Sequence, residues 1–166
     1  MGRRTVRRRL GVLLLVTAFT VGACGNGGLQ FRKDDRVDIT APADRARVVA
    51  PLDVRWTTKG LVLGEAGGPA QFGVFVDRAP IHPGQSMSAV GDDACRRTPG
   101  CPDEGYLRDR FIYLTRKTSL TLDTLPAKST SNRYGARDAH DVTIVLVDAD
   151  GRRHGESSWS VEFTSR

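Results

Sequence analysis

The chain has 166 residues, about one domain's worth, and a formal net charge of +6. With 39% hydrophobic and 27% charged residues, its composition excludes a disordered chain and a protein that crosses a membrane many times. The first nine residues hold five of its 25 basic side chains. The rest of the chain keeps 20 basic and 19 acidic side chains, and this near balance argues against a nucleic-acid partner.

The N-terminus has the pattern of an export signal. After the basic residues, Leu10–Gly22 is an apolar run of 13 residues, shorter than the roughly 20 that span a bilayer. An uncleaved membrane anchor is the alternative interpretation. The run ends in Val21, Gly22, Ala23 and Cys24, which resembles the bacterial lipobox.

That resemblance implies a lipoprotein signal peptide over residues 1–23 and a diacylglycerol on the Cys24 thiol. The lipidated residues 24–35, which include GNGG, then form a flexible tether. Acyl chains, such as palmitate, would hold the protein on membrane lipid at the extracytoplasmic face of the cell membrane.

From Arg36 onward the chain predicts β-strands, because apolar residues recur with period two and no convincing helix is present. We expect about seven short strands, which lie near residues 37–39, 52–57, 72–76, 111–115, 119–125, 142–147 and 159–164. The stretch 142–147 is apolar on both faces and predicts the central strand. The expected core comprises the inward-facing residues Val37, Ile39, Leu52, Val54, Trp56, Phe72, Val74, Val76, Leu120, Leu122, Val142, Ile144, Leu146, Trp159, Val161 and Phe163.

This pattern predicts an all-β fold, an antiparallel sandwich over residues 36–166. Ala139–Gly151 (AHDVTIVLVDADG) and Ile39–Trp56 resemble strands of bacterial immunoglobulin-like and fibronectin-III-like modules. The whole chain also resembles lipoproteins of actinobacteria, which implies a location and no activity. The cysteine pair and third-strand Trp of antibody domains are missing from the expected positions.

A long connection separates the third and fourth predicted strands. Arg78–Arg110 spans 33 residues, well beyond the usual loop length, and contains Cys95 and Cys101. With Cys24 lipidated, these two cysteines should form a disulfide outside the cytoplasm. The loop is either a stiffened structural excursion or a binding hairpin; a redox-active pair is disfavoured because the spacing is not C-x-x-C. The candidate binding residues are Arg96, Arg97, Asp103 and Glu104.

The sequence offers no metal site and no catalytic motif. His82, His140 and His154 are scattered, and His140 has the position of a structural imidazole. Asp148–Gly151 resembles the start of a calcium loop but lacks the downstream glutamate, so we interpret it as a hairpin turn. No G-x-S-x-G motif occurs, and a chain of this size needs no cofactor for stability.

The sequence therefore predicts a membrane-anchored surface lipoprotein that acts as a non-catalytic binding or accessory module of the cell envelope. Its expected partner is an envelope protein or a cell-wall component. The alternative function is a small-ligand or metal-ion carrier on an immunoglobulin-like scaffold. That alternative would require clustered His or Met residues, and His82 and Met87 are the only neighbouring pair.

Overall fold

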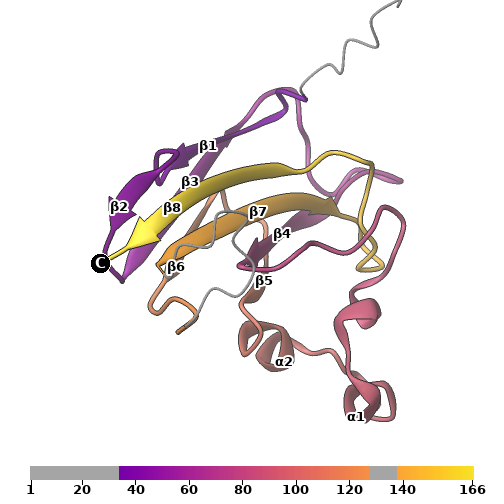
Figure 1. Cartoon of the computed structure of the whole chain (residues 1–166). Coiled ribbons are helices and arrows are strands. Elements are labelled where there is room, and N and C mark those ends of the chain that lie inside the picture. Colours follow the sequence, from indigo (N-terminus) through magenta and orange to yellow (C-terminus); the bar gives the residue numbers. More distant parts are fainter. Residues whose placement is uncertain (1–33, 128–137) are drawn as a thin grey trace, which may run out of the picture. The chain divides into compact units, whose positions relative to one another are not determined.

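The computed structural model describes residues 34–127 and 138–166, which form two β-sheets (Figure 1). The predicted signal peptide 1–23 and the lipidation site Cys24 lie outside the described residues. One sheet has three strands in the order β1-β3-β6, and the other has five in the order β2-β8-β7-β4-β5. The strands are β1 Val37–Ala41, β2 Ala46–Val48, β3 Leu52–Thr58, β4 Gln71–Val76, β5 Ile112–Thr115, β6 Ser119–Leu122, β7 Ala139–Val147 and β8 Trp159–Ser165.

Local alternation explains why these segments are strands. In β3, Leu52, Val54 and Trp56 are buried while the residues between them are exposed, so one face of the strand enters the core. β7 lies in the middle of its sheet, between β8 and β4, and is buried on both faces over Val142–Val147. The prediction of this segment as the central strand is confirmed.

The main hydrophobic core fills the space between the two sheets. Of the sixteen expected core residues, fourteen are buried there, and the remaining two, Ile39 and Leu120, pack against them half-buried. Trp56 of one sheet meets Phe72 of the other edge to face, with ring centroids 5.3 Å apart. Aromatic contacts of this kind stabilise the sandwich beyond simple area burial.

The all-β sandwich is confirmed, with one strand more than expected. The additional strand β2 is only three residues long and pairs in parallel with β8, whereas every other pairing is antiparallel. Three residues are too few to show a period-two pattern, which is why the sequence did not reveal this strand. The chain thus passes from one sheet in β1 to the edge of the other in β2.

Asp34, which lies inside the stretch predicted as a tether, contacts the folded domain. Trp159 Nε1 donates a hydrogen bond to the Asp34 carbonyl at 2.8 Å, and Ser157 Oγ donates to the Asp34 carboxylate. Arg36 binds the same carboxylate with Nη2 at 2.7 Å. This hydrogen bond from Arg36 is the largest cause that holds the pKa of Asp34 well below its usual range.

Candidate functional site: the disulfide-linked cap

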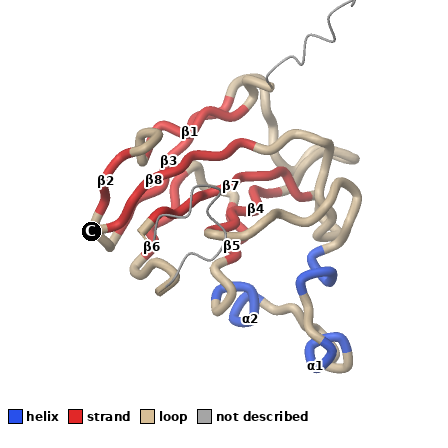
Figure 2. The backbone as a smooth tube through the Cα atoms, in the orientation of Figure 1, coloured by secondary structure: helices blue, strands red, loops and turns tan. Residues whose placement is uncertain are grey.

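The long connection between β4 and β5 covers the outer face of the five-stranded sheet. We call residues 78–110 the cap. The cap contains a 3-10 turn over Met87–Val90 and two short helices, α1 (Asp93–Arg96) and α2 (Glu104–Arg108). No helix was predicted from the sequence, because helices of four and five residues are too short to produce a helical periodicity. Figure 2 shows that both helices belong to this one connection.

A second hydrophobic cluster fastens the cap to the sheet. Phe75, Val145 and Val147 from the outer face of the sheet are buried with Ile81, Met87, Leu107 and Ile112 from the cap and β5. Packing at this contact is close: a Cβ on Gly73 would lie 3.0 Å from Val147 Cγ2 and 3.3 Å from Met87 Cε. The apolar outer face of β7 therefore has a partner in its own chain.

A buried arginine adds a polar fastening at the base of the cap. Arg153 Nη1 donates to the Ile81 carbonyl at 2.8 Å, and Nη2 donates to the Glu156 carbonyl at 2.7 Å. Burial lowers the pKa of this guanidinium. These bonds connect the start of the cap to the turn between β7 and β8.

The expected disulfide is present and stiffens the outer part of the cap. Cys95 and Cys101 are joined with their Cα atoms 5.2 Å apart. Asp92 caps α1, and its Oδ1 accepts a hydrogen bond from the Cys95 N–H at 2.8 Å. Cys95 is buried against Gly91, where an added Cβ would lie 3.1 Å from the Cys95 Sγ. The disulfide and the helix cap thus hold the same residue, Cys95, in one position.

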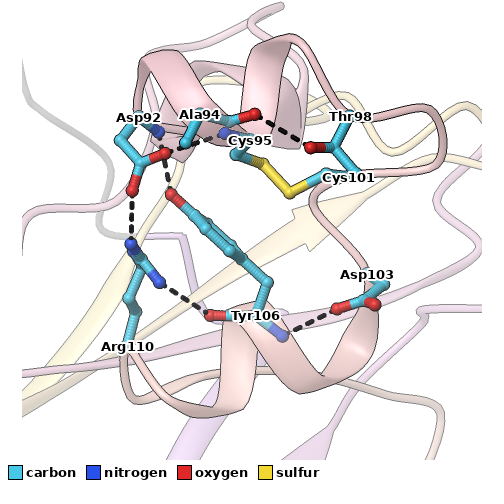
Figure 3. Close-up of a disulfide and its surroundings, with 8 residues drawn as sticks. All are labelled: Asp92, Ala94, Cys95, Thr98, Cys101, Asp103, Tyr106 and Arg110. Carbon is cyan, nitrogen blue, oxygen red and sulfur yellow. Dashed lines mark hydrogen bonds and ion pairs between the residues drawn. A yellow bond between two sulfur atoms is a disulfide. The ribbon is translucent and has the colours of Figure 1, made fainter.

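Three side chains connect the two helices of the cap to each other, as Figure 3 shows. The Asp92 N–H donates to Tyr106 Oη at 2.8 Å, and Arg110 Nη2 donates to Asp92 Oδ2 at 2.8 Å. The Arg110 guanidinium carbon also lies 3.5 Å from the centroid of the Tyr106 ring, a cation–π contact. The Cys95 N–H is the largest cause that lowers the pKa of the Asp92 carboxyl, with Tyr106 and the Arg110 charge adding to it.

The four predicted binding residues are all exposed, but they have different local roles. Arg96 forms a surface ion pair with Asp93 at 3.1 Å, and Arg97 is the C-cap of α1. Asp103 is the N-cap of α2, where its Oδ1 accepts a hydrogen bond from the Tyr106 N–H at 2.8 Å.

Glu104, the fourth predicted residue, pairs with Arg108 one helical turn later. Asp92, Tyr106 and Arg110, which shape the cap, were not among the residues predicted from the sequence. The signal available was the capping pattern, since Asp92 and Asp103 each stand immediately before a short helix.

A second polar cluster has the connectivity of a Ser-His-Asp triad. His140 Nδ1 lies 2.6 Å from Asp77 Oδ2, and His140 Nε2 lies 3.0 Å from Ser165 Oγ. His140 is buried and stacks on Phe163, and both of its ring nitrogens have a hydrogen-bonding partner.

The backbone N–H groups beside this cluster are already hydrogen-bonded. The N–H groups of Ser165 and Arg166 donate to the carbonyls of Asp138 and Val48 at 2.8 and 3.0 Å, so they do not form an oxyanion hole. Asp77 follows β4, His140 lies in β7 and Ser165 ends β8. The cluster therefore ties the ends of three strands together.

Within residues 34–127 and 138–166, no group of three or more His, Cys, Asp or Glu side chains is arranged to hold a metal ion. No helix in this described part is both long enough and apolar enough to cross a bilayer. No protein-family model, curated protein or solved structure matches the chain.

Proposed function

We propose that this chain is a surface lipoprotein, anchored to the membrane through acylated Cys24, whose sandwich is a non-catalytic binding or accessory module of the cell envelope. The lipobox-like residues before Cys24 support the anchor. The Cys95–Cys101 disulfide supports a location outside the cytoplasm, because thiols in the cytoplasm are kept reduced.

The observation that carries the binding role is the construction of the cap. Its base is fixed to the sheet by a hydrophobic cluster, and its outer part is held by a disulfide and the Asp92–Arg110 ion pair. A surface already held in one conformation loses little conformational entropy when a partner binds. Arg96 and Arg97 are exposed on this stiffened surface and are our candidate contacts. The partner in this proposal is another envelope protein or a cell-wall component.

The test is capture from detergent-solubilised envelope with the full-length protein as bait. Arg96→Ala combined with Arg97→Ala should reduce capture at least tenfold and leave the melting temperature nearly unchanged, because both side chains are exposed. Asp103 is left intact in this variant, since losing an N-cap costs about 1 kcal/mol and would confuse binding with stability.

The matched control is Arg47→Ala combined with Arg55→Ala, which removes the same charge from exposed positions on strands β2 and β3. This control should retain full capture. If the cap variant and the control capture the same partners equally well, the cap is not the contact surface.

The anchor is tested separately: Cys24→Ala should abolish labelling by radioactive palmitate, and persistent labelling would refute acylation at Cys24.

A further inference from the structure

On the same side of the sandwich, each sheet ends in an edge with which no other strand of residues 34–127 and 138–166 pairs. β5 is the last strand of the five-stranded sheet and β6 is the last strand of the three-stranded sheet. The Val76 N–H donates to the Phe111 carbonyl, which sets the alternation of hydrogen bonds along the β4–β5 pair. By this alternation, the backbone groups of Ile112 and Leu114 point away from β4, toward an edge where no other described strand pairs.

This edge lies in a groove between two walls. Leu107 and Arg108 of α2 line one side, Leu120 and Thr121 of β6 line the other, and Tyr113 lies between them. The groove has a volume of about 570 Å³ and continues past Tyr113 into a second hollow of about 680 Å³. Burial raises the pKa of the Tyr113 phenol, as expected where water is partly excluded.

The two ends of the groove carry opposite charges. Lys117 lines the end beyond Thr115, where β5 finishes. Asp109 and Asp123 line the continuation at the start of β5. These three side chains form no ion pair with any residue of 34–127 or 138–166, whereas Arg108 in the middle is neutralised by Glu104.

We propose that this groove binds an extended peptide of a partner protein, which adds to β5 as a sixth strand. Exposed strand edges bind peptides in this way: backbone hydrogen bonds supply affinity, and alternate side chains enter the flanking pockets. The peptide carries an acidic residue opposite Lys117, a basic residue opposite Asp109 and Asp123, and alternating apolar residues that contact Tyr113 and Leu120. Antiparallel addition continues the β4–β5 geometry and places the acidic residue at the N-terminal end of the peptide.

The two walls favour a single chain over a second copy of this protein. Neighbouring strands must approach to about 4.8 Å, and a second β5 would bring its own α2 and β6 into the same space. The inference rests on the proposed binding function and adds the chemistry of the partner. It uses the edge of β5, while the test of the proposed function uses Arg96 and Arg97, so the two can fail separately.

The experiment presents the full-length protein in detergent with a bead library of seven-residue peptides. One half of the library begins with glutamate and ends with lysine, the other half has these ends exchanged, and alternate inner positions vary among valine, isoleucine, leucine, phenylalanine and tyrosine. We expect the glutamate-first half to supply at least ten times as many binding beads. The best sequence is then resynthesised with a fluorescent label and measured by anisotropy.

Two changes distinguish strand addition from non-specific peptide binding. Methylating the peptide nitrogens that face β5 should weaken binding at least tenfold, because it removes the backbone donors. The variant Lys117→Glu with Asp123→Lys, both exposed positions, should invert the preference between the two halves of the library.

Absence of binding beads in both halves overturns the proposal, as does binding that backbone methylation or the charge exchange leaves unchanged. A preference for lysine-first peptides overturns the antiparallel polarity. Self-association of the protein that Lys117→Glu alone abolishes would assign the edge to a second copy instead. Loss of envelope capture by the Arg96 and Arg97 variant together with a failed library screen would leave the binding function standing and reject only the groove.

Discussion

The two faces of β4 show how one strand serves two different hydrophobic clusters. Phe72 faces the other sheet and belongs to the main core, and Phe75 faces outward and belongs to the cluster beneath the cap. Both side chains are at most 1% exposed. The main core joins strands from the whole chain, whereas the outer cluster fastens a single connection. Although Phe72 and Phe75 are equally buried, we therefore expect their removal to lower the free energy of unfolding by different amounts.

The largest effect is expected from emptying these two positions one at a time. Phe72→Ala should lower the free energy of unfolding by about 3–5 kcal/mol, because a core cavity adds to the lost transfer energy. Phe75→Ala removes the same side chain from beneath the cap. Because the cap can detach while the sandwich stays folded, the loss in free energy of unfolding should not exceed the free energy with which the cap packs on the sheet. Urea unfolding followed by tryptophan fluorescence measures the difference.

Hydrogen exchange provides the control for that pair. In Phe75→Ala, the amides of Leu107 and Asp109 in the cap should exchange faster while the amide of Ile144 in β7 keeps its protection. In Phe72→Ala, all three should lose protection together. Equal losses of stability with uniform exchange in both variants would mean that core and cap unfold as one cooperative unit.

A smaller effect is expected from opening the disulfide. The closed ring spans few residues, so reduction of the Cys95–Cys101 bond should lower the free energy of unfolding by about 2 kcal/mol. The loss of structure after reduction should be confined to the cap, and capture of envelope partners should decrease because the cap is the proposed contact surface. The double variant Cys95→Ala with Cys101→Ala should show the same loss without further response to dithiothreitol. A sandwich that unfolds on reduction would contradict a local role.

The smallest effect is a pH dependence within the cap. The folded pKa of Asp92 lies below its value of about 3.9 in an unfolded chain, so its stabilising contribution is present above about pH 4. That contribution is lost as the pH falls through the lower, folded pKa. The protection factor of the Cys95 amide, the ratio of its exchange rate in an unfolded chain to that in the folded protein at the same pH, should therefore fall in acid in the native protein, and Asp92→Asn should show a weaker dependence.

The matched variant for this measurement is Asp93→Asn, which makes the same change of charge at the next residue. Among the described residues, Asp93 pairs with the exposed Arg96 side chain, and it is Asp92 that accepts the Cys95 N–H, so exchange at Cys95 in Asp93→Asn should match the native protein. A difference between native protein and Asp92→Asn that stays constant from pH 7 to pH 2 would show that the carboxylate charge does not hold the cap.

The main core was predictable because its signal is local. The alternation of Leu52, Val54 and Trp56 is visible within six residues. Because a shift of one residue would turn these apolar side chains to the solvent face, the alternation fixes which face of the strand is buried. The outer cluster was less accessible to sequence reasoning. Val145 and Val147 were recognised as apolar on the second face of their strand, but nothing in their own segment identified Met87 and Leu107 as the residues that cover them.

In the candidate site, too, some features were predictable from the sequence and others were not. Position in the chain was enough to predict the disulfide, because the proposed acylation of Cys24 leaves only Cys95 and Cys101 to pair. Position was not enough to sort exposed charges into free and engaged ones: Asp103 caps a helix, while Arg97 is an exposed helix end. The Asp77–His140–Ser165 cluster was also inaccessible, since its members are separated by 63 and 25 residues.

The sequence by itself determined seven of the eight strands of this protein, the faces that form the main core and the cysteine pair, because those properties depend on neighbours along the chain. Tertiary structure alone decided that the long connection lies on the sheet as a cap and that two strand edges meet beside α2. Those features depend on contacts between distant segments, whose free energy is gained only after the sheets have paired.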